Sequence, residues 1–590
     1  MLGLPVGAAA RTLAPGGALG ASTRTLAGPD LAVDSVDAPR QVLTDSSFSI
    51  VVRISERTGE LGASATVTAS ANGVVIATAP VVVDAGGTAT LSLPATLRAS
   101  GTTHVDIEVS GAVPEEAVLD NNSRAVDIEA TDFQITPGGA VGPALAGYGA
   151  QFNQNVYATI SRNDGVTEDN VRTLERSVLE LRPQFSRIFF SQAALTDPDL
   201  MQSFVRTVLL AQRTGTTINI TWQGGTLSVK SGTVQRFAGV LLDLVQKRGV
   251  TNLRWLTLQN EPNSTKMTPT QYEAQYRELD PYIANIRGQV HLMGGDLVQT
   301  SQDAWLTYMA SNMADILDAY SIHVFWDYWD TAKLEARLTE VQAIVAKLPE
   351  AGRKPIYVTE YGIRGLRTFS GAPTTDPGVW EDGTPMAQTN VGAFQQAWFD
   401  VLAARLGYVG ASKWDLYFGR YDKAVQAYYV IGGPKTGWPR HPLFNLLYLL
   451  TRTVKPGWHT VQLDAVQDTT LLLAAYAGPE GQWTVIGLDR AGGQLNTVSS
   501  TVVPYSIGGL PPSTLFRLVP WNEVGDGLNG PVTTVTTDEA GVAVFAEPQN
   551  AVFVLTTVTG NLWPRGQGRR RPTEPPDRGV QWLDRRPQAP

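Results

Sequence analysis

Residues 31–130 alternate between apolar and polar positions, and turn residues separate the short runs. Three of these runs predict strands with one buried face, Phe48–Ile54, Ala65–Ala69 and His104–Val109. Asn72-Gly73 lies between two apolar runs and predicts a two-residue hairpin turn. Short strands at this spacing predict a β-sandwich of about 100 residues.

The pattern changes over residues 131–455, where apolar strand candidates alternate with helical stretches, as in repeated βα units. Eight strands are predicted, Gly147–Asn153, Phe185–Ser191, Thr217–Gly225, Arg254–Glu261, Val290–Leu297, Ala319–Trp326, Lys354–Gly362 and Tyr408–Phe418. Predicted helices between them include Asp169–Leu181, Leu200–Thr214, Val234–Arg248, Thr270–Asn285, Leu334–Leu348 and Ala393–Leu406. Eight such units match a (β/α)₈ barrel of about 250 residues. An open doubly wound sheet is disfavoured because no glycine-rich phosphate loop follows the first strand.

Residues 456–562 return to a strand-like pattern, as in Thr470–Tyr476 and Ala551–Leu555, and predict a C-terminal β-domain. The predicted fold class is therefore multidomain, with a central TIM barrel flanked by a β-sandwich and a β-domain. Residues 1–30 are either a degenerate export signal, interrupted by Arg11, or a disordered leader. Residues 563–590 form a Pro- and Arg-rich tail that we expect to be disordered.

Composition narrows the classes of function. The 590 residues are 43% hydrophobic and 17% charged, which is typical of globular domains in water. A net charge of −9 argues against a nucleic-acid partner, and no apolar run is long enough for a membrane-spanning helix. The absence of cysteine excludes disulfides and thiolate chemistry. We expect a monomer.

Two carboxylates carry the candidate chemistry, Glu261 and Glu360, because each ends a predicted barrel strand. Active sites of (β/α)₈ enzymes lie at the carboxyl ends of their strands, so both side chains are expected at one rim. A pair of carboxylates can cleave a glycosidic bond, one as the acid that protonates the leaving oxygen and the other as nucleophile or base.

Asn260-Glu261-Pro262 on the fourth strand, with a Glu ending the seventh, resembles glycoside hydrolase clan A, which includes cellulases, β-mannanases and β-xylosidases. The resemblance implies that Glu261 is the acid/base of a retaining mechanism and that Glu360 is the nucleophile. It also implies that Asn260 binds the sugar 2-hydroxyl beside the cleaved bond.

Further positions fit this resemblance. Arg187 resembles the arginine of the second strand, which would hold Glu360 ionised, and a surface arginine is the alternative. His323 resembles the histidine of the sixth strand, and a buried structural histidine is the alternative. Trp414 resembles the tryptophan of the eighth strand that forms the floor under the sugar, unless it packs in the core. Tyr148 is a weaker candidate near the end of the first strand.

Aromatic residues gather where loops are expected and can line a sugar-binding cleft, with ordinary packing as the alternative for each. They are Trp222, Trp326, Tyr328, Trp329, Trp380, Tyr417 and Tyr421. The run Phe325–Trp329, directly after a strand, predicts a wall of that cleft. The segment 364–389 after the seventh strand is expected to form a lid or subsite loop. Two positions depart from many clan members, since the third strand lacks a terminal His and Phe325 stands where a Tyr would contact the nucleophile. Tyr361 or Tyr328 are candidates to replace that Tyr.

The N-terminal residues carry a second resemblance. Leu119-Asp120-Asn121-Asn122-Ser123 and the residues around it resemble the end of adhesion-related sandwich domains of the CARDB type, which implies a spacer or binding module.

These observations predict an extracellular or cell-surface retaining glycosidase that acts on a polysaccharide or oligosaccharide. We expect no metal and no cofactor, because two carboxylates need none and the five His lack zinc-ligand spacing. The alternatives are a catalytically inactive carbohydrate-binding or adhesion protein and a transglycosylase on the same barrel.

Overall fold

Alternating burial along the first strands shows how the N-terminal residues fold into two sheets. The computed structural model describes residues 28–116, 118–328, 330–364, 384–385, 388–419, 428–466, 470–491, 501–521, 532–548, 551–562 and 564. Most of the predicted leader and tail therefore lies outside the described residues. Contacts divide the chain into two units, one ending at Ala130 and the other beginning at Thr131.

The N-terminal unit is a β-sandwich. One sheet has the order β1-β3-β6 and the other β2-β8-β7-β4-β5. The strands are β1 (Leu31–Asp37), β2 (Gln41–Leu43), β3 (Ser47–Glu56), β4 (Ala63–Ala71), β5 (Val74–Val83), β6 (Thr88–Thr96), β7 (Gly101–Val113) and β8 (Ser123–Thr131). The predicted hairpin turn joins β4 to β5, and both Asn72 and Gly73 have the positive φ that a type I′ turn requires. Inward-facing side chains of both sheets form one core.

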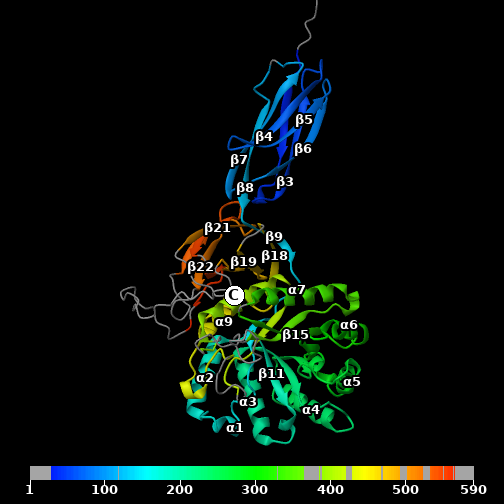
Figure 1. Ribbon diagram of the computed structural model, residues 1–590, viewed down its shortest axis with the longest axis vertical. Helices are drawn as coiled ribbons and strands as arrows, with labels where there is room; N and C mark the ends of the chain where they lie inside the picture. Colours follow the sequence, from blue (N-terminus) through cyan, green and yellow to red (C-terminus); the bar gives the residue numbers. More distant parts are fainter. Residues whose placement is uncertain are drawn as a thin grey trace, which may run out of the picture. The chain divides into compact units, whose positions relative to one another are not determined.

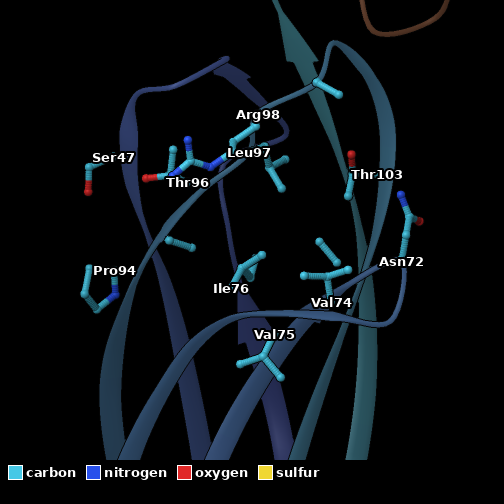
Figure 2. Close-up of a pocket in the computed structure, with 13 residues that line it drawn as sticks. Ser47, Asn72, Val74, Val75, Ile76, Pro94, Thr96, Leu97, Arg98 and Thr103 are labelled. Carbon is cyan, nitrogen blue, oxygen red and sulfur yellow. The ribbon is translucent and has the colours of Figure 1, made fainter.

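One end of the sandwich is open. A cavity of about 680 Å³ lies between β5 and β6 there, and Figure 2 shows apolar side chains such as Val74, Ile76 and Leu97 around it, with Arg98 at its edge.

The second unit contains the predicted barrel. Among the described residues, eight parallel strands have the order β10-β17-β16-β15-β14-β13-β12-β11, and a bridge between Phe152 and Ile188 closes the ring. The strands are β10 (Gly147–Ala150), β11 (Phe185–Ser191), β12 (Thr217–Gln223), β13 (Leu253–Leu258), β14 (His291–Leu297), β15 (Ala319–Asp327), β16 (Ile356–Arg364) and β17 (Gly410–Lys413). The predicted fold class is confirmed.

Helices surround this barrel, as Figure 1 shows for α2 to α6. They are α1 (Thr159–Arg162), α2 (Glu168–Leu181), α3 (Pro198–Thr214), α4 (Thr233–Leu242), α5 (Pro269–Leu279), α6 (Gln302–Asn312), α7 (Thr331–Lys347), α8 (Asn390–Arg405) and α9 (Pro442–Thr453). Capping residues start several of them. Thr167 and Thr268 each form a capping box, and Asp197 accepts hydrogen bonds from the first turn of α3. No helix in the described residues is long and apolar enough to cross a membrane.

A nine-stranded sheet completes the second unit, in the order β23-β22-β25-β20-β19-β18-β9-β21-β24. Its strands are β9 (Phe133–Ala140), β18 (His459–Ala465), β19 (Leu471–Ala477), β20 (Trp483–Asp489), β21 (Val502–Gly508), β22 (Leu515–Trp521), β23 (Thr533–Thr536), β24 (Ala543–Pro548) and β25 (Val552–Thr556). Residues 133–140 were predicted within the barrel, but β9 instead pairs with β18 and β21. Buried side chains of β19 and β20 join the core of the barrel, so the sheet and the barrel share one apolar interior.

Glu56 ties three loops of the sandwich together, and this contact generates a testable prediction. Its carboxylate accepts hydrogen bonds from the backbone N–H groups of Asp30 (3.2 Å), Thr58 (3.0 Å), Gly59 (2.8 Å) and Gly86 (2.8 Å). Burial opposes ionisation, but these donors and the Thr58 hydroxyl lower the pKa of Glu56 from 4.5 to about 2. The ionised form is therefore the one that stabilises the fold.

We predict that Glu56→Gln lowers the free energy of unfolding of the sandwich by about 1–3 kcal/mol, because an amide cannot accept from all four donors. The stabilisation by Glu56 is fully present above pH 4.5 and is lost as the pH falls toward 2. Calorimetry of the full chain, with hydrogen exchange to identify the transition of residues 31–131, measures the change. Glu108→Gln, at an exposed position on β7, is the control. Equal stability of both variants with wild type at pH 7 would contradict the role of Glu56.

Candidate active site

The candidate acid/base, Glu261, lies beyond the end of its strand. β13 ends at Leu258, and Glu261 starts the short 3₁₀ helix η3 (Pro262–Ser264). The predicted strand Arg254–Glu261 was therefore too long. Its last residues cannot continue a strand because Gln259 and Glu261 have left-handed backbone conformations, with φ of 72° and 49°. Such conformations in residues other than glycine are strained and cluster at functional sites.

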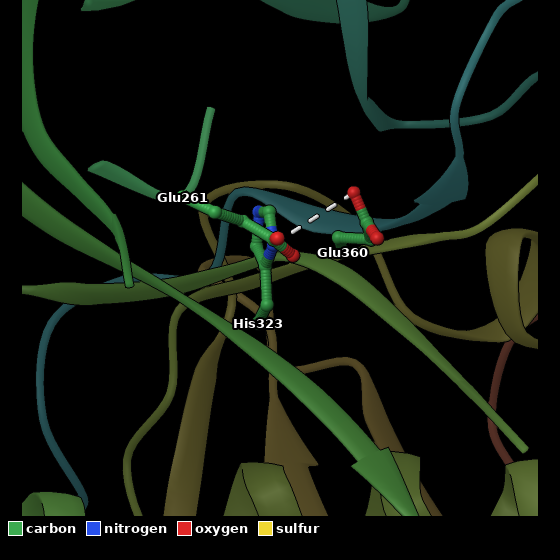
Figure 3. Close-up of side chains that lie close together, drawn as sticks. All are labelled: Glu261, His323 and Glu360. Atoms are coloured by element: carbon green, nitrogen blue, oxygen red, sulfur yellow. Dashed lines mark hydrogen bonds and ion pairs between the residues drawn. The ribbon is translucent and has the colours of Figure 1, made fainter. Parts of the chain in front are cut away.

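Glu360 lies within β16, directly beside His323 of β15 in the sheet register. His323 Nδ1 is 2.9 Å from Glu261 Oε1 and 3.7 Å from Glu360 Oε2. One donor atom from each of the three side chains lies within 4.8 Å of the other two. Figure 3 shows the three side chains converging from separate segments. The barrel thus brings together two carboxylates that are 99 residues apart in sequence.

Arg187, from β11, is completely buried and contacts the carboxylate of Glu360. Its guanidinium forms an ion pair with Glu360 and donates to Asn260 Oδ1 (2.9 Å) and Gln151 Oε1 (2.6 Å). Its central carbon lies 4.3 Å from the ring centre of Phe189 and 5.5 Å from that of Trp414. A buried cation in this position attracts the carboxylate of Glu360 and stacks favourably on both rings.

Asp296, at the end of β14, belongs to the same cluster and was missed by sequence reasoning. Its side chain is 0% exposed, and Oδ2 lies 3.1 Å from Arg187 Nη1. Oδ1 accepts hydrogen bonds from the hydroxyls of Ser321 (2.9 Å) and Thr359, and Oδ2 accepts from Thr221 (3.3 Å). A carboxylate near the end of an otherwise apolar strand, after two glycines, was the available signal in the sequence.

The protonation states follow from these neighbours. Burial lowers the pKa of His323, but the charge of Glu360 and the contacts with Asp296 and Glu261 outweigh burial and raise it to about 9. Burial raises the pKa of Asp296, yet Arg187 and His323 hold it well below its usual range. For Glu261, burial is likewise opposed by the hydrogen bond from His323, and the net effect lowers the pKa.

Three of the residues predicted to bind substrate lie elsewhere. Trp222 is fully buried against Phe190 and Phe237, and its Nε1 donates to the carbonyl of Gly225 at 2.8 Å. Trp326 is buried and stacks on Phe399 of α8. Successive side chains of a strand point to opposite faces. Each of these two tryptophans lies an odd number of positions from an inward-facing residue of its own strand, so its side chain faces the surrounding helices.

Tyr148 follows the same rule. It lies three positions before the inward-facing Gln151, is buried, and its hydroxyl hydrogen-bonds that of Tyr476 in the nine-stranded sheet at 2.6 Å. Trp326, Trp222 and Tyr148 are therefore packing residues and not parts of a cleft wall.

The other aromatic candidates divide into two groups. Trp414 is half-buried beside Arg187, and its ring meets Phe189 edge to face at 5.9 Å between centres. Tyr417 and Tyr328 are buried, and the hydroxyl of Tyr361 contacts Gln396 and Asp400 of α8, so Tyr361 does not replace the missing tyrosine at the nucleophile. Trp329, Trp380, Tyr421 and nearly all of the expected lid segment 364–389 lie outside the described residues.

Glu261, His323 and Glu360 are close enough together to be considered as ligands of a metal ion. Among the described residues they are the one cluster with this spacing. Contacts with Glu261 at Nδ1 (2.9 Å) and with Arg187 at Nε2 (3.0 Å) already occupy both ring nitrogens of His323. The adjacent Arg187 cation also repels a metal ion. We therefore assign these side chains to proton and charge chemistry.

The fold is similar to solved structures of glycosidases. A family 30 subfamily 8 xylanase from Clostridium acetobutylicum is 11% identical, with a TM-score of 0.51, over 72% of this chain and 100% of that chain. A family 51 α-L-arabinofuranosidase from Bifidobacterium longum is 11% identical, with a TM-score of 0.52, over 73% and 100%. No family model and no curated protein matches the sequence. At this identity the likeness shows the fold, and the predicted resemblance to clan A barrels is confirmed at that level.

A CARDB domain from Pyrococcus furiosus is also similar, at 21% identity over 17% of this chain and 93% of that domain, with a TM-score of 0.16.

Trp222 and Trp414 differ in burial, and this difference can be tested through the free energy of unfolding of variants that lack each ring. We predict that Trp222→Ala lowers the free energy of unfolding by about 3–5 kcal/mol, because it empties a fully enclosed site. Trp414→Ala, at a half-exposed position, is the matched variant and is expected to cost less. Urea unfolding followed by far-ultraviolet circular dichroism measures both. A larger loss for Trp414→Ala than for Trp222→Ala would show that the burial of the two rings is assigned incorrectly.

Proposed function

We propose that this protein is a retaining glycoside hydrolase that cleaves O-glycosidic bonds in a polysaccharide or oligosaccharide by double displacement. Glu360 is the nucleophile and Glu261 is the acid/base. The observation that carries the proposal is the separation of the two carboxylates, which have oxygens within 4.8 Å of each other. Retaining glycosidases have carboxyl groups about 5–5.5 Å apart, whereas inverting enzymes need roughly 6.5–9.5 Å to admit a water molecule.

The surroundings of the two carboxylates support different roles. The side chain of Glu360 is 9% exposed and is paired with the buried Arg187, which holds it in a fixed position, as a nucleophile requires. The side chain of Glu261 is 27% exposed and can reach a leaving oxygen at the opening of the barrel. Two carboxylates in such different environments can divide nucleophilic and proton-transfer work between them.

The polar and aromatic groups beside the carboxylates support a sugar substrate. Asn260 is half-buried and is oriented by Arg187, which leaves its amide N–H groups to donate to a sugar hydroxyl. The half-exposed Trp414 offers an aromatic face next to Glu360's partner, Arg187. Pyranose C–H groups pack well on such a face.

We also propose the setting in which the enzyme works. The barrel carries the catalysis, with the sandwich (31–130) as a spacer or binding module and the C-terminal β-domain (456–562), joined by β9, as structural support. The similar solved structures are glycosidases of the xylanase and arabinofuranosidase types. We propose that the enzyme works outside the cell or at its surface, where such polymers occur, as a monomer without a nucleic-acid partner.

The roles of the two carboxylates predict different responses to the leaving group. Glu360→Ala is expected to lose at least roughly a thousandfold in kcat/KM on every substrate, because no covalent intermediate can form. Glu261→Ala is expected to lose as much on polysaccharides but far less on 2,4-dinitrophenyl glycosides, whose leaving group needs no proton. Glu340→Ala, an exposed position on α7, is the control and should retain wild-type rates.

A panel of xylosides, glucosides and arabinofuranosides, with plant, fungal and bacterial polysaccharides, supplies the substrates. Hydrolysis by Glu360→Ala at the wild-type rate would refute the assignment. Sugar binding with no turnover by wild type across the panel would favour the inactive binding protein. Products longer than the substrate, formed when an acceptor sugar is added, would identify a transglycosylase.

A further inference from the structure

Two cationic groups meet in the interior of the barrel. Arg187 Nη1 and His323 Nε2 are 3.0 Å apart, and the two side chains are 0% and 1% exposed. If His323 is neutral, Nε2 accepts a hydrogen bond from Arg187. If His323 is protonated, two positive charges face each other where water cannot screen them, and an anion beside both must compensate them.

Asp296 has the position of that anion. Its Oδ2 is 3.1 Å from Arg187 Nη1, and its Oδ1 is 3.6 Å from His323 Nε2, so one carboxylate spans both cations. Three hydroxyl groups, from Thr221, Ser321 and Thr359, donate to its oxygens and hold it in this orientation. Hydrogen bonds to the ionised form favour the charge on Asp296.

The backbone is built to bring Asp296 against β15. Gly295 has φ of +138°, and a Cβ added there would lie 2.1 Å from the carbonyl oxygen of Ser321. Asp296 itself has φ of 53°, in the left-handed region. Only glycine permits the close approach at residue 295, and the left-handed residue that follows turns the carboxylate toward His323.

Charged groups face His323 from every element packed around it. Arg187 comes from β11, Glu261 follows β13, Asp296 comes from β14 and Glu360 from β16. From α7, Arg337 Nη2 donates to the carbonyl oxygen of His323 at 3.4 Å. Three carboxylates therefore surround the imidazole, and of these Asp296 alone contacts Nε2.

We propose that Asp296 is a positioning residue that keeps His323 protonated on both ring nitrogens, so that Nδ1 stores the proton that Glu261 passes to the leaving group. This inference deepens the proposed function and rests on it. It assigns the 2.9 Å contact between His323 Nδ1 and Glu261 Oε1 to a proton relay.

The relay balances over the two chemical steps. In the first step, a Glu360 oxygen bonds to the anomeric carbon, and the glycosidic C–O bond breaks. The Nδ1 proton of His323 first passes to Glu261, and the leaving oxygen takes it from there, while the Nε2 proton stays directed at Asp296. In the second step, water attacks the anomeric carbon and the bond to Glu360 breaks. The proton of that water returns through Glu261 to Nδ1.

The protonation states agree with this scheme. The pKa of Glu261 is lowered, which leaves its carboxylate without a proton in the resting enzyme, and the pKa of His323 is raised to about 9. Because the pKa of His323 is raised to about 9, His323 carries the Nδ1 proton below that pH and loses it as the pH rises above it. Asp296→Asn keeps the shape of the side chain but removes its charge, so Nε2 would accept from Arg187 and His323 would become neutral at lower pH.

The test is a titration of the full-length chain with ¹³C-labelled histidine, followed by NMR. The chain has five histidines, and His323→Gln identifies the signal of His323. The expected midpoint for His323 in wild type is about 9. In Asp296→Asn it is expected to fall by about 1–3 pH units, the effect of one charge at this distance. Because NMR needs no substrate, this result stands even if the protein proves not to be a glycosidase.

Activity provides the second readout. The alkaline limb of kcat/KM on substrates with poor leaving groups should follow the His323 midpoint in both proteins, while kcat/KM on dinitrophenyl glycosides changes little. Asp318→Asn is the matched control, because Asp318 lies near Arg287 (3.4 Å) and His291 (3.6 Å) outside the site. It should leave both the His323 signal and the alkaline limb unchanged.

Two results would overturn the inference. The first is a wild-type His323 that titrates at or below 6.5, which requires no Asp296 variant and so decides the matter even if Asp296→Asn fails to fold. The second is a folded Asp296→Asn protein whose His323 midpoint equals that of wild type.

Discussion

The structure of the candidate site depends on one buried guanidinium. Arg187 is completely enclosed, and an uncompensated charge there would be very costly, so the barrel must supply anions and acceptors around it. It does so from several strands at once, through Glu360, Asp296, Asn260 and Gln151. These contacts set the orientation of Glu360 and the charge of its neighbours. The closed ring of strands is what allows one side chain to reach all of them.

Side chains alternate between the two faces of a strand, and this alternation shows which residues of the candidate site could be predicted from the sequence. Arg187 and His323 were identified through the resemblance to clan A, and both are buried in the interior. Trp222, Trp326 and Tyr148 also lie near strand ends, but each has the opposite parity and faces the helices or the nine-stranded sheet. The sequence therefore contained the information to exclude them, since the side-chain period of a strand is two. Their aromatic character alone was a poor guide.

Other features had no local signature. Asp296 follows an irregular stretch of β14, where the register with β15 shifts between Gly294 and Leu297, so counting positions cannot tell which way it points. β9 reads as an ordinary strand next to the barrel, yet its partner β18 lies more than 300 residues later in the chain. Such pairings depend on tertiary contacts and not on local pattern. The short-range features, by contrast, were predictable, as the Asn72-Gly73 turn and the strand Phe185–Ser191 show.

The central claim is that Glu360 forms a covalent bond to the sugar. It is tested most directly by incubating the wild-type protein with a panel of 2-deoxy-2-fluoro glycosides that carry good leaving groups, followed by peptide mass spectrometry. Our account predicts a single added sugar on the peptide that contains Glu360, with loss of activity in proportion to labelling. Labelling of a different carboxylate, or complete turnover of the probes with inversion of configuration and no adduct, would contradict it.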